Sequence, residues 1–422
     1  MGKTVIAIEA RIPDPATVGG VAQVIMSLAD GLSRLQNGDE EYVFIGTEES
    51  RSWLGKRTSG PCRLHVVAPG YKERLLQSSV GPILLSAREF LRSARYSIKP
   101  PGNPSGVAIA RSDGVAESLG AKLIHFVTQR AYITDCPSIY HPHDLQHVHM
   151  PNFFDAKTLR WRQQNYPAFC ERAKVVAVES TWTKKDVVAN LNVPENKVII
   201  VPMPPPIVTS SIESTNADLS SFAQLPSRFI LYPAQTWPHK NHLRLIDALA
   251  ILKSEFGLVV PLVATGRQNE FYATIAARVA EARLGDQIRF LGYVDDARLT
   301  ALYRSAVAVV VPTKFESLSL PIWEAFAIGT PVACSRVTSL PEQLAGAGLL
   351  FDPDDPKDIA LAIRKLWQDD RLREDFVAKG AARLRDFSWD RTARHFRAIY
   401  RRAVGSKLTG EDEQLLSAPA II

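Results

Sequence analysis

Glu316 and Glu324 stand on either side of a predicted turn from a loop into a helix. The N-terminus of that helix, at Leu318, Ser319 and Leu320, should offer free N–H groups and the positive end of the helix dipole, which together suit a phosphate. One carboxylate could then bind a sugar on one side of the phosphate, and the other a ribose on the opposite side. The simpler alternative is that Glu324 only complements the helix dipole.

The residues around this pair predict a strand, a helix and a second strand. Residues 307–311 form an unbroken apolar run, which favours a parallel strand buried on both faces. Pro321 suits the first turn of a helix, and Gly329 followed by Pro331 supplies its stop before Val332 begins another strand. The loop that carries the first glutamate would therefore follow a central strand.

This segment resembles a known signature. The residues from Phe315-Glu316 to Glu324-Ala325, followed by Gly-Thr-Pro-Val at 329–332, resemble the E-x7-E signature of retaining glycosyltransferases of family 4, which have the GT-B fold. The resemblance implies that Glu316 contacts the donor-sugar hydroxyls and that Glu324 contacts the ribose of the nucleotide. Ser317 and Ser319 stand where that family usually has glycines, so the backbone would approach the phosphates differently.

The length of 422 residues and the hydrophobic content of 46% predict two domains of about 200 residues each. The resemblance implies an α/β protein of the GT-B type, with two Rossmann-like domains facing each other across a cleft. We expect an acceptor-binding domain over 1–204, a nucleotide-sugar-binding domain over 205–388, a helix over 389–404 that packs back on the first domain, and a tail over 405–422. The proline-rich run at 201–206 suits the linker.

In the first half, Gly19 and Gly20 open a predicted helix after the first strand, which would let a ligand approach the backbone closely. The third glycine of a dinucleotide-binding fingerprint is missing, and no phosphate-binding P-loop motif occurs in the sequence, so NAD and P-loop functions lose support. The resemblance implies that this glycine pair faces the cleft and the donor phosphates.

Four of the nine histidines lie between His141 and His149, a grouping that raises the possibility of a metal site. H-x-H spacing on an extended chain is possible for a metal site, but the spacing alone is weak support and we expect none. His143-Asp144 instead resembles the His-Asp element of family 4 enzymes. The resemblance implies that His143 hydrogen-bonds the donor sugar or pyrophosphate, and that Asp144 fixes the tautomer of its ring.

Lys240 ends the segment Pro-Ala-Gln-Thr-Trp-Pro-His-Lys at 233–240 and lies close to a predicted helix start. A solvated surface lysine is the ordinary alternative. The resemblance implies a lysine that binds the donor pyrophosphate, usually with an arginine five or six residues earlier, where this chain has Ala234 and Gln235. Either Arg267 supplies the second cation, or Lys240 and helix N-termini act alone. The loop with Tyr293 should lie near the base.

The net charge of +6 is unevenly distributed. The segment 51–99 carries ten Lys or Arg against two Glu, so a lipid headgroup, a phosphate-bearing acceptor or nucleic acid could bind there. The predicted helix over 82–96 could lie on an anionic membrane, although an ordinary core helix with a basic outer face is the favoured interpretation. Nucleic acid is not expected as a partner.

The cysteines and the start of the chain indicate a compartment. Cys62, Cys136, Cys170 and Cys334 form no C-x-x-C pair, which favours a reducing environment without a disulfide framework. The first apolar run is too short for a signal peptide or a membrane span. We therefore expect a cytoplasmic protein that could associate peripherally with the inner face of the membrane.

Together these features predict a retaining glycosyltransferase that moves a hexose from a GDP- or UDP-sugar to a saccharide or lipid-linked saccharide in surface polysaccharide synthesis. Mannose is one candidate hexose, because the segment 233–241 resembles that of bacterial enzymes that use GDP-mannose. No cofactor is expected. Two alternatives stay open: another GT-B enzyme, such as a sugar phosphorylase or a nucleotide-sugar epimerase, and a non-catalytic module that binds a nucleotide or an anion.

Overall fold

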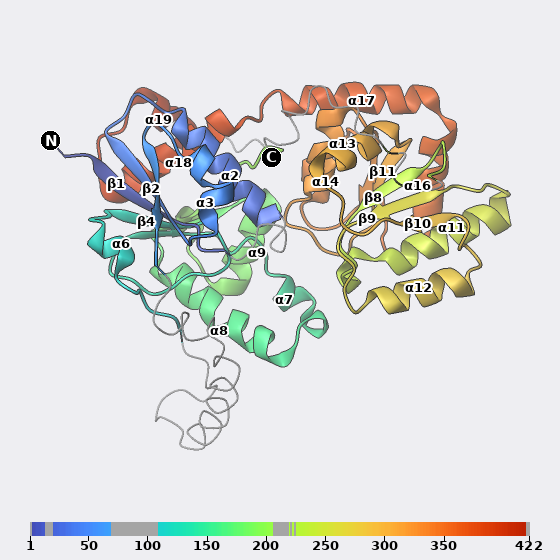
Figure 1. Cartoon of the computed structure of the whole chain (residues 1–422), viewed down its shortest axis with the longest axis horizontal. Helices are drawn as coiled ribbons and strands as arrows, with labels where there is room; N and C mark the ends of the chain where they lie inside the picture. Colours follow the sequence, from blue (N-terminus) through green and yellow to red (C-terminus); the bar gives the residue numbers. More distant parts are fainter. Residues whose placement is uncertain are drawn as a thin grey trace, which may run out of the picture.

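The computed structural model describes residues 2–12, 20–68, 109–205 and 225–418, together with Leu219 and Phe222. Gly19, residues 69–99 of the basic segment and the predicted helix over 82–96 lie outside the described residues. The described chain forms two α/β halves, which lie side by side in Figure 1.

The first half is built on a seven-stranded sheet in the order β3-β2-β1-β4-β5-β6-β7, and every strand pair is parallel. Its strands are β1 (Thr4–Glu9), β2 (Glu40–Gly46), β3 (Cys62–Val66), β4 (Leu123–Phe126), β5 (Ser138–Tyr140), β6 (Val175–Val178) and β7 (Val198–Ile200). Its helices are α2 (Gly20–Ser33), α3 (Ser50–Trp53), η1 (Gly55–Arg57), α6 (Val115–Ser118), α7 (Gln146–His149), η2 (Pro151–Phe153), α8 (Ala156–Arg172), α9 (Thr181–Leu191) and η3 (Glu195–Lys197).

The second half is built on a six-stranded parallel sheet in the order β10-β9-β8-β11-β12-β13. Its strands are β8 (Ile230–Pro233), β9 (Leu262–Thr265), β10 (Ile288–Phe290), β11 (Ala308–Val311), β12 (Val332–Ser335) and β13 (Leu349–Phe351). Its helices are η4 (Pro238–Lys240), α11 (His242–Phe256), α12 (Tyr272–Glu281), α13 (Asp296–Ser305), α14 (Leu320–Ile328), α15 (Leu340–Leu344), α16 (Pro356–Gln368) and α17 (Asp370–Leu384).

Both sheets follow the order expected for Rossmann-like domains, in which the strand order reverses beside the first strand. The strands β4, β6, β9, β11 and β12 are buried along their whole length, because helices cover both faces of each sheet. The apolar run at 307–311 is β11, as predicted. The predicted helix after it is α14, with proline in its first turn and Gly329 at its end in a left-handed conformation (φ +85°).

The chain returns from the second half to the first after α17. Figure 1 shows α17 along the top of the second half and α18 (Trp389–Val404) back on the first half, where α18 packs against α2. Its buried residues Trp389, Ala393, Phe396 and Tyr400 share one core with β1 and α2. The domain boundaries themselves stay a prediction.

The segment 405–422 is not simply a tail. Its residues 410–417 form α19 (Gly410–Ser417), which begins with a capping box in which Thr409 and Asp412 bond each other's backbone N–H groups. The buried carboxylate of Asp412 also binds the guanidinium of Arg401 on α18 (2.8 Å). The residues of the capping box were a local signal that could have indicated this helix, whereas the ion pair with α18 is a tertiary contact that no local pattern shows.

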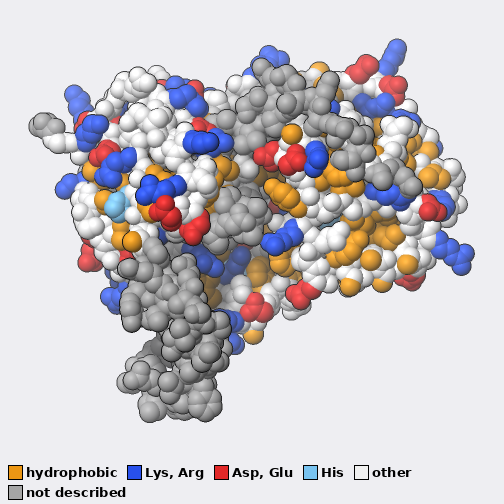
Figure 2. All heavy atoms as spheres, in the orientation of Figure 1, with side chains coloured by type: hydrophobic (Ala, Val, Ile, Leu, Met, Phe, Trp, Pro, Cys, Tyr) orange, Lys and Arg blue, Asp and Glu red, His pale blue; other side chains and the backbone are white. Residues whose placement is uncertain are grey.

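The described part of the basic segment is largely compensated. Three of its cations are ion-paired within the first half: Arg51 with Glu48, Arg57 with Asp30 and Arg63 with Glu41. On the face in Figure 2, the Lys and Arg side chains that are drawn in colour are interspersed with Asp and Glu. No helix in the described part of the chain is long and apolar enough to span a bilayer. Membrane contact through residues 51–99 stays a prediction.

Candidate functional site

The loops that carry Lys240 and Glu316 follow neighbouring strands of the second sheet. Lys240 ends the short helix η4 after β8, and Glu316 lies in the loop after β11. Because β8 pairs in parallel with β11, both loops leave the same edge of the sheet. This edge, where the strand order reverses, is the usual ligand-binding position in open α/β sheets. The fold therefore brings together two residues that lie 76 positions apart.

Lys240 and Glu316 form a direct ion pair, in which the ammonium group donates to the carboxylate. Their side chains are 22% and 15% exposed, so both groups can be reached from solvent but are partly shielded by protein. The Tyr232 hydroxyl holds the backbone carbonyl of Lys240 (2.7 Å). Shielding strengthens the interaction of these groups with a charged ligand relative to that in water.

The backbone of the Glu316 loop is held by residues after β12 that the sequence analysis did not identify. The hydroxyls of Thr338 and Ser339 both donate to the Glu316 carbonyl, at 2.5 and 3.0 Å. The Gln343 side chain accepts from the Ser319 amide (2.9 Å) and donates to the Ser319 carbonyl (2.7 Å). The prediction of a free amide at Ser319 is therefore wrong, because a neighbouring helix supplies its acceptor.

The amides of Leu318 and Leu320 remain available at the start of α14: within the described residues neither donates a hydrogen bond. The hydroxyl of Ser319, between them, is buried and has no partner among the described residues. A ligand oxygen at this helix start could satisfy these donors, since buried polar groups rarely stay unpaired. The arrangement suits an anionic oxygen at the N-terminus of α14.

Glu324 lies one turn further along α14 and bonds the hydroxyl of Tyr303 on α13 (2.5 Å). The carboxylate is packed deeply among protein atoms, and burial raises its pKa to about 6, while the Tyr303 hydrogen bond acts in the opposite direction. Glu324 is therefore bound to a side chain of its own domain rather than to Lys240. The alternative that it only complements the helix dipole loses support, because it lies beyond the first turn.

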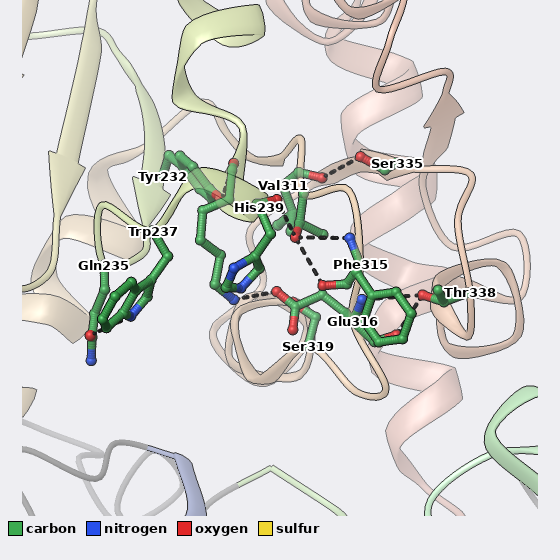
Figure 3. A network of polar contacts seen from close by, with 12 residues as sticks. Tyr232, Gln235, Trp237, His239, Val311, Phe315, Glu316, Ser319, Ser335 and Thr338 are labelled. Carbon is green, nitrogen blue, oxygen red and sulfur yellow. Dashed lines mark hydrogen bonds and ion pairs between the residues drawn. The ribbon is translucent and has the colours of Figure 1, made fainter. Parts of the chain in front are cut away.

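The loops after β8, β9 and β10 are joined to one another. The amide of Thr236 donates to the Arg267 carbonyl (3.3 Å), and the Gly266 amide donates to the Gly292 carbonyl (2.7 Å). Gln235 accepts a hydrogen bond from the indole of Trp237 (2.9 Å), and Figure 3 shows the two side chains lying together. The Arg267 side chain is exposed, and its backbone carbonyl lies in this group of loops.

Tyr293 follows directly, and its side chain is 66% exposed beside the same loops. Trp237 is also exposed, at 45%. Exposed aromatic rings can bury much apolar area when they stack on a ligand, so both rings are candidates for contact with the base.

Gly20 begins α2 in the first half and lies against Leu320 at the start of α14 in the second. A Cβ atom at position 20 would stand 2.9 Å from a methyl carbon of Leu320. The glycine therefore allows two helix N-termini from different halves to meet. Gly19 lies outside the described residues, so its predicted role stays untested.

His143 is paired with Glu179, a residue that the sequence analysis did not single out. Its Nδ1 lies 2.7 Å from the Glu179 carboxylate, and its Nε2 lies 2.7 Å from the Val127 carbonyl. Because both neighbours are acceptors, both ring nitrogens must donate, and the ring is an imidazolium. Burial lowers the pKa of His143, but the Glu179 carboxylate outweighs this effect and the net shift is upward.

Asp144 does not fix the ring of His143, and this correction follows from its contacts. Its carboxylate accepts from Gln129 (3.2 Å), from Arg162 (3.2 Å) and from the amide of Gln146 (3.0 Å). Position 143 has a left-handed backbone (φ +59°), which is strained for a residue with a side chain. With this backbone at position 143, the His143 ring contacts Glu179, whereas the Asp144 carboxylate contacts Arg162.

His141, His143 and Glu179 form a group whose ligand-type atoms all lie within 4.8 Å of one another. Both nitrogens of His141 and one oxygen of Glu179 are buried without a partner among the described residues. The two nitrogens of His143, however, already donate hydrogen bonds, so a metal would have to displace a proton and a bond. A hydrogen-bonded ion pair accounts for His143 and Glu179 as they stand.

An aromatic cluster joins the two halves next to Glu316. Phe315, which precedes that glutamate, packs edge-on against Trp182 of α9 with 5.5 Å between ring centroids. The ring of His149 lies 5.4 Å from Phe315 and is bonded to Asp186 (2.6 Å). The amide of Thr181 also donates across the halves to Glu342 of α15 (3.0 Å). The loop of Glu316 is thus fixed from both halves.

Residues 218–383 match the family described as "Glycosyl transferases group 1". This part of the chain is a group 1 glycosyltransferase domain. It contains the Lys240 and Glu316 loops, α14 and both of its glutamates. The O-antigen chain mannosyltransferase B of Escherichia coli is 29% identical to this glycosyltransferase over 273 residues, which cover 61% of this chain and 71% of the relative.

A second relative, the serotype-specific mannosyltransferase WbdA of Escherichia coli, is 32% identical over 171 residues. These residues cover 40% of this chain and 21% of the relative, so the glycosyltransferase spans about a fifth of that longer protein. The crystal structure of Anabaena HepE in complex with UDP and glucose superposes with a TM-score of 0.67 at 15% identity, and covers 94% of this chain and 100% of that one. These likenesses agree with the predicted GT-B fold.

The structure brings the predicted residues of the glycosyltransferase together in groups. Lys240 meets Glu316 directly, and the start of α14 meets Gly20 across the halves. His143 is bound to Glu179, and Glu324 to Tyr303. The supporting residues Thr338, Ser339 and Gln343 carry no motif, and only their position after a neighbouring parallel strand could have indicated them.

Proposed function

We propose that this glycosyltransferase moves a hexose from a nucleoside diphosphate sugar to a saccharide or lipid-linked saccharide acceptor, with retention of the anomeric configuration. The Lys240 ammonium, next to Glu316 at the edge where the sheet order reverses, is the observation that carries the proposal. Breaking the sugar–phosphate bond leaves a diphosphate with added negative charge. A fixed cation and helix-start amides stabilise such charge where it develops.

Each residue has a defined part in this proposal. Lys240 and the amides of Leu318 and Leu320 hold the leaving diphosphate, with Gly20 leaving room beside them. Glu316 exchanges its contact with Lys240 for the hydroxyls of the sugar. Retention requires no covalent intermediate on a carboxylate if the acceptor hydroxyl and the leaving group share one face of the sugar, and the departing phosphate can then take up the acceptor proton.

The remaining polar groups bind the rest of the donor. Glu324 accepts from the ribose hydroxyls, and Tyr293 lies beside the base. His143, compensated by Glu179, contributes to the polar wall of the site on the side of the first half. Arg267 supplies the second cation, in place of the arginine that the family usually has where this chain has Gln235. No step of this sequence uses a metal or another cofactor.

The donor is proposed from the relatives. The two Escherichia coli relatives described above are named as mannosyltransferases, which supports mannose and a GDP-linked donor, whereas the HepE structure contains UDP and glucose. The acceptor is proposed to be a surface polysaccharide chain or its lipid-linked precursor, because the first relative is named for the O-antigen chain. Synthesis of such a chain would place the enzyme in the cytoplasm, at the inner face of the membrane.

One incubation series tests the proposal. The purified chain is mixed with UDP-, GDP- and ADP-sugars, and release of the free nucleoside diphosphate is measured with and without saccharide acceptors. We expect release from one class of donor, with acceptor stimulation and a product whose anomeric proton shows retention by NMR. An epimerised donor, or turnover that depends on free phosphate, would identify one of the rival GT-B enzymes instead. Nucleotide binding without any release would indicate a non-catalytic module.

A further inference from the structure

A cavity of about 310 Å³ lies in the first half, away from Lys240 and Glu316. Its walls come from α9, the edge strand β7, α18 and α19. Pro202, from the chain crossing into the second half, and residues 386–388, from the chain crossing back, also line it. The cavity therefore lies where both connections between the halves pass.

The cations of α18 fall into two groups. Arg394, Arg397 and Arg401 each contact an acidic side chain, from α19 or β2. Arg391 and Arg402 line the cavity, and neither guanidinium has a hydrogen-bond or ion-pair partner among residues 2–12, 20–68, 109–205 and 225–418. One side of a single helix is thus neutralised, and the other side is not.

His395 lies between these two arginines on the same side of α18, four residues after Arg391 and seven before Arg402. Burial and, to a smaller extent, the positive charges of Arg391 and Arg402 together lower its pKa to about 4. Nearby positive charge disfavours the imidazolium, so the lowered pKa of His395 agrees with excess positive potential in the cavity.

The other charged groups around the cavity do not remove that excess. Lys184 and Glu195 face each other at 3.5 Å and largely cancel. Asp386 is the remaining acid in the lining and is exposed. Among the described residues, the lining therefore has one half-buried guanidinium group, Arg391, and one exposed one, Arg402, without a partner, against one exposed carboxylate.

Apolar side chains complete the wall next to the arginines. Phe387, Leu415 and Leu416 are each half-buried there. A ligand that satisfies the whole site would combine an anionic head with a short apolar group. Guanidinium groups bind phosphate through paired N–H donors, so phosphate is the head that they fit best.

We propose that this cavity is a binding site for a phosphate ester with an apolar substituent, held by Arg391 and Arg402 and separate from the donor site. The ligand would be a phosphate monoester or diester that carries a carbon chain. A free phosphorylated metabolite and a lipid headgroup both present such an ester.

His395 provides the readout. In the Lys240→Ala variant, which weakens phosphate binding at the donor site, the protein is titrated with inorganic phosphate and with octyl phosphate while the pKa of His395 is followed by NMR. The His395→Gln spectrum assigns its signal. We expect the pKa of His395 to rise by about one to two units, because an anion within a few ångströms favours the imidazolium. Octyl phosphate should act at a lower concentration than phosphate.

The double variant Arg391→Gln/Arg402→Gln should weaken octyl phosphate binding by about tenfold or more, as expected for lost charge-assisted hydrogen bonds. Arg394→Gln, which removes a paired arginine of the same helix, is the matched control and should bind as the parent does. Thermal unfolding of each variant shows that the fold is intact. Unchanged binding by the double variant, or no shift of His395 with either phosphate, would overturn the proposal.

Flotation with vesicles separates the two sources of the ligand. Binding to phosphatidylglycerol vesicles that is absent with phosphatidylcholine, and is lost in the double variant, assigns the site to a lipid headgroup. Binding of octyl phosphate without vesicle binding assigns it to a free phosphate ester. Both results support the site, and donor turnover by the double variant in the absence of phosphate should equal that of the parent.

Discussion

Lys240 donates to the carboxylate of Glu316, so the two charged side chains compensate each other at one edge of the sheet. The two residues are proposed to bind different parts of one donor, the diphosphate and the sugar. Their ion pair therefore keeps each charge compensated in the free enzyme and holds both side chains at the same edge of the sheet. Donor binding would replace this one contact by two.

Replacing the lysine tests the proposed charge on the leaving group. Lys240→Ala should lower turnover by about a hundredfold or more, because it removes one preorganised charge from the developing diphosphate. Nucleoside diphosphate release from the best donor measures the effect. Lys365→Ala, an exposed lysine of α16, is the control and should leave turnover unchanged. A Lys240→Ala enzyme with normal turnover would count against the whole assignment.

Replacing the glutamate separates its two contacts. Glu316→Gln removes the ion pair and weakens the proposed sugar contact, but it leaves Lys240 free to meet a phosphate. We expect the variant to bind the nucleoside diphosphate as tightly as the parent or more tightly, while turnover of the donor sugar falls by about tenfold or more. Calorimetry and turnover measure the two effects. Equal losses in both would contradict the assignment of Glu316 to the sugar.

Glu324 should make donor binding depend on pH. Its pKa of about 6 lies above the usual value of 4.5, because burial disfavours the carboxylate. The ionised carboxylate accepts hydrogen bonds from a ribose hydroxyl more strongly than the protonated acid does, so affinity for the nucleoside diphosphate should fall as the pH drops through about 6. Tyr303→Phe removes the hydrogen bond that lowers this pKa, and should move the midpoint upward. Glu324→Gln should abolish this component of the pH profile.

The same shift has a consequence for stability. A carboxylic acid with a raised pKa in the folded state holds its proton after the unfolded chain has lost it, so the free energy of unfolding falls as the pH rises from about 4.5 to about 6. The contribution is up to about 2 kcal/mol for a shift of this size. Chemical denaturation of the parent and Glu324→Gln across this range measures it, and parallel profiles would contradict the raised pKa.

Gly266 fixes the loop that carries Arg267. Its backbone is left-handed (φ +115°), and a Cβ atom there would lie 2.5 Å from the backbone carbon of Ala234. Gly266→Ala should therefore destabilise the protein by about 1–3 kcal/mol and should also weaken donor binding, because the loops after β8 and β9 would separate. Gly285→Ala is the control, since open space surrounds that position and its φ is not positive. Denaturant unfolding compares the two.

Arg401 holds the returning helix on the first half. Its guanidinium lies between Glu40 of β2 and Asp412 of α19, and all three residues are buried. Arg401→Ala should cost about 3–5 kcal/mol, because it leaves two buried carboxylates without a partner. Arg394→Ala breaks an exposed pair with Glu411 and should cost less than about 1 kcal/mol. Similar losses for the two variants would contradict the assigned importance of this network.

The sequence alone determined the local elements around the site. The apolar run of β11, the proline that begins α14 and the glycine that ends it act within a few residues, so periodicity and capping were enough to place them. The position of Lys240 beside a helix start followed in the same way. Glu316 and Glu324 lie in one continuous stretch of chain, so their spacing could be read from the sequence. The resemblance of that spacing to a known signature then supplied the fold class.

Only the tertiary structure decided which side chains meet. Lys240 and Glu316 are partners because β8 and β11, far apart in the sequence, are neighbours in one parallel sheet. Glu179 took the place expected for Asp144, since strained backbone at His143 directs its ring toward the next strand along. Such pairings depend on strand order and on the packing of one half against the other, and no local pattern of residues encodes either.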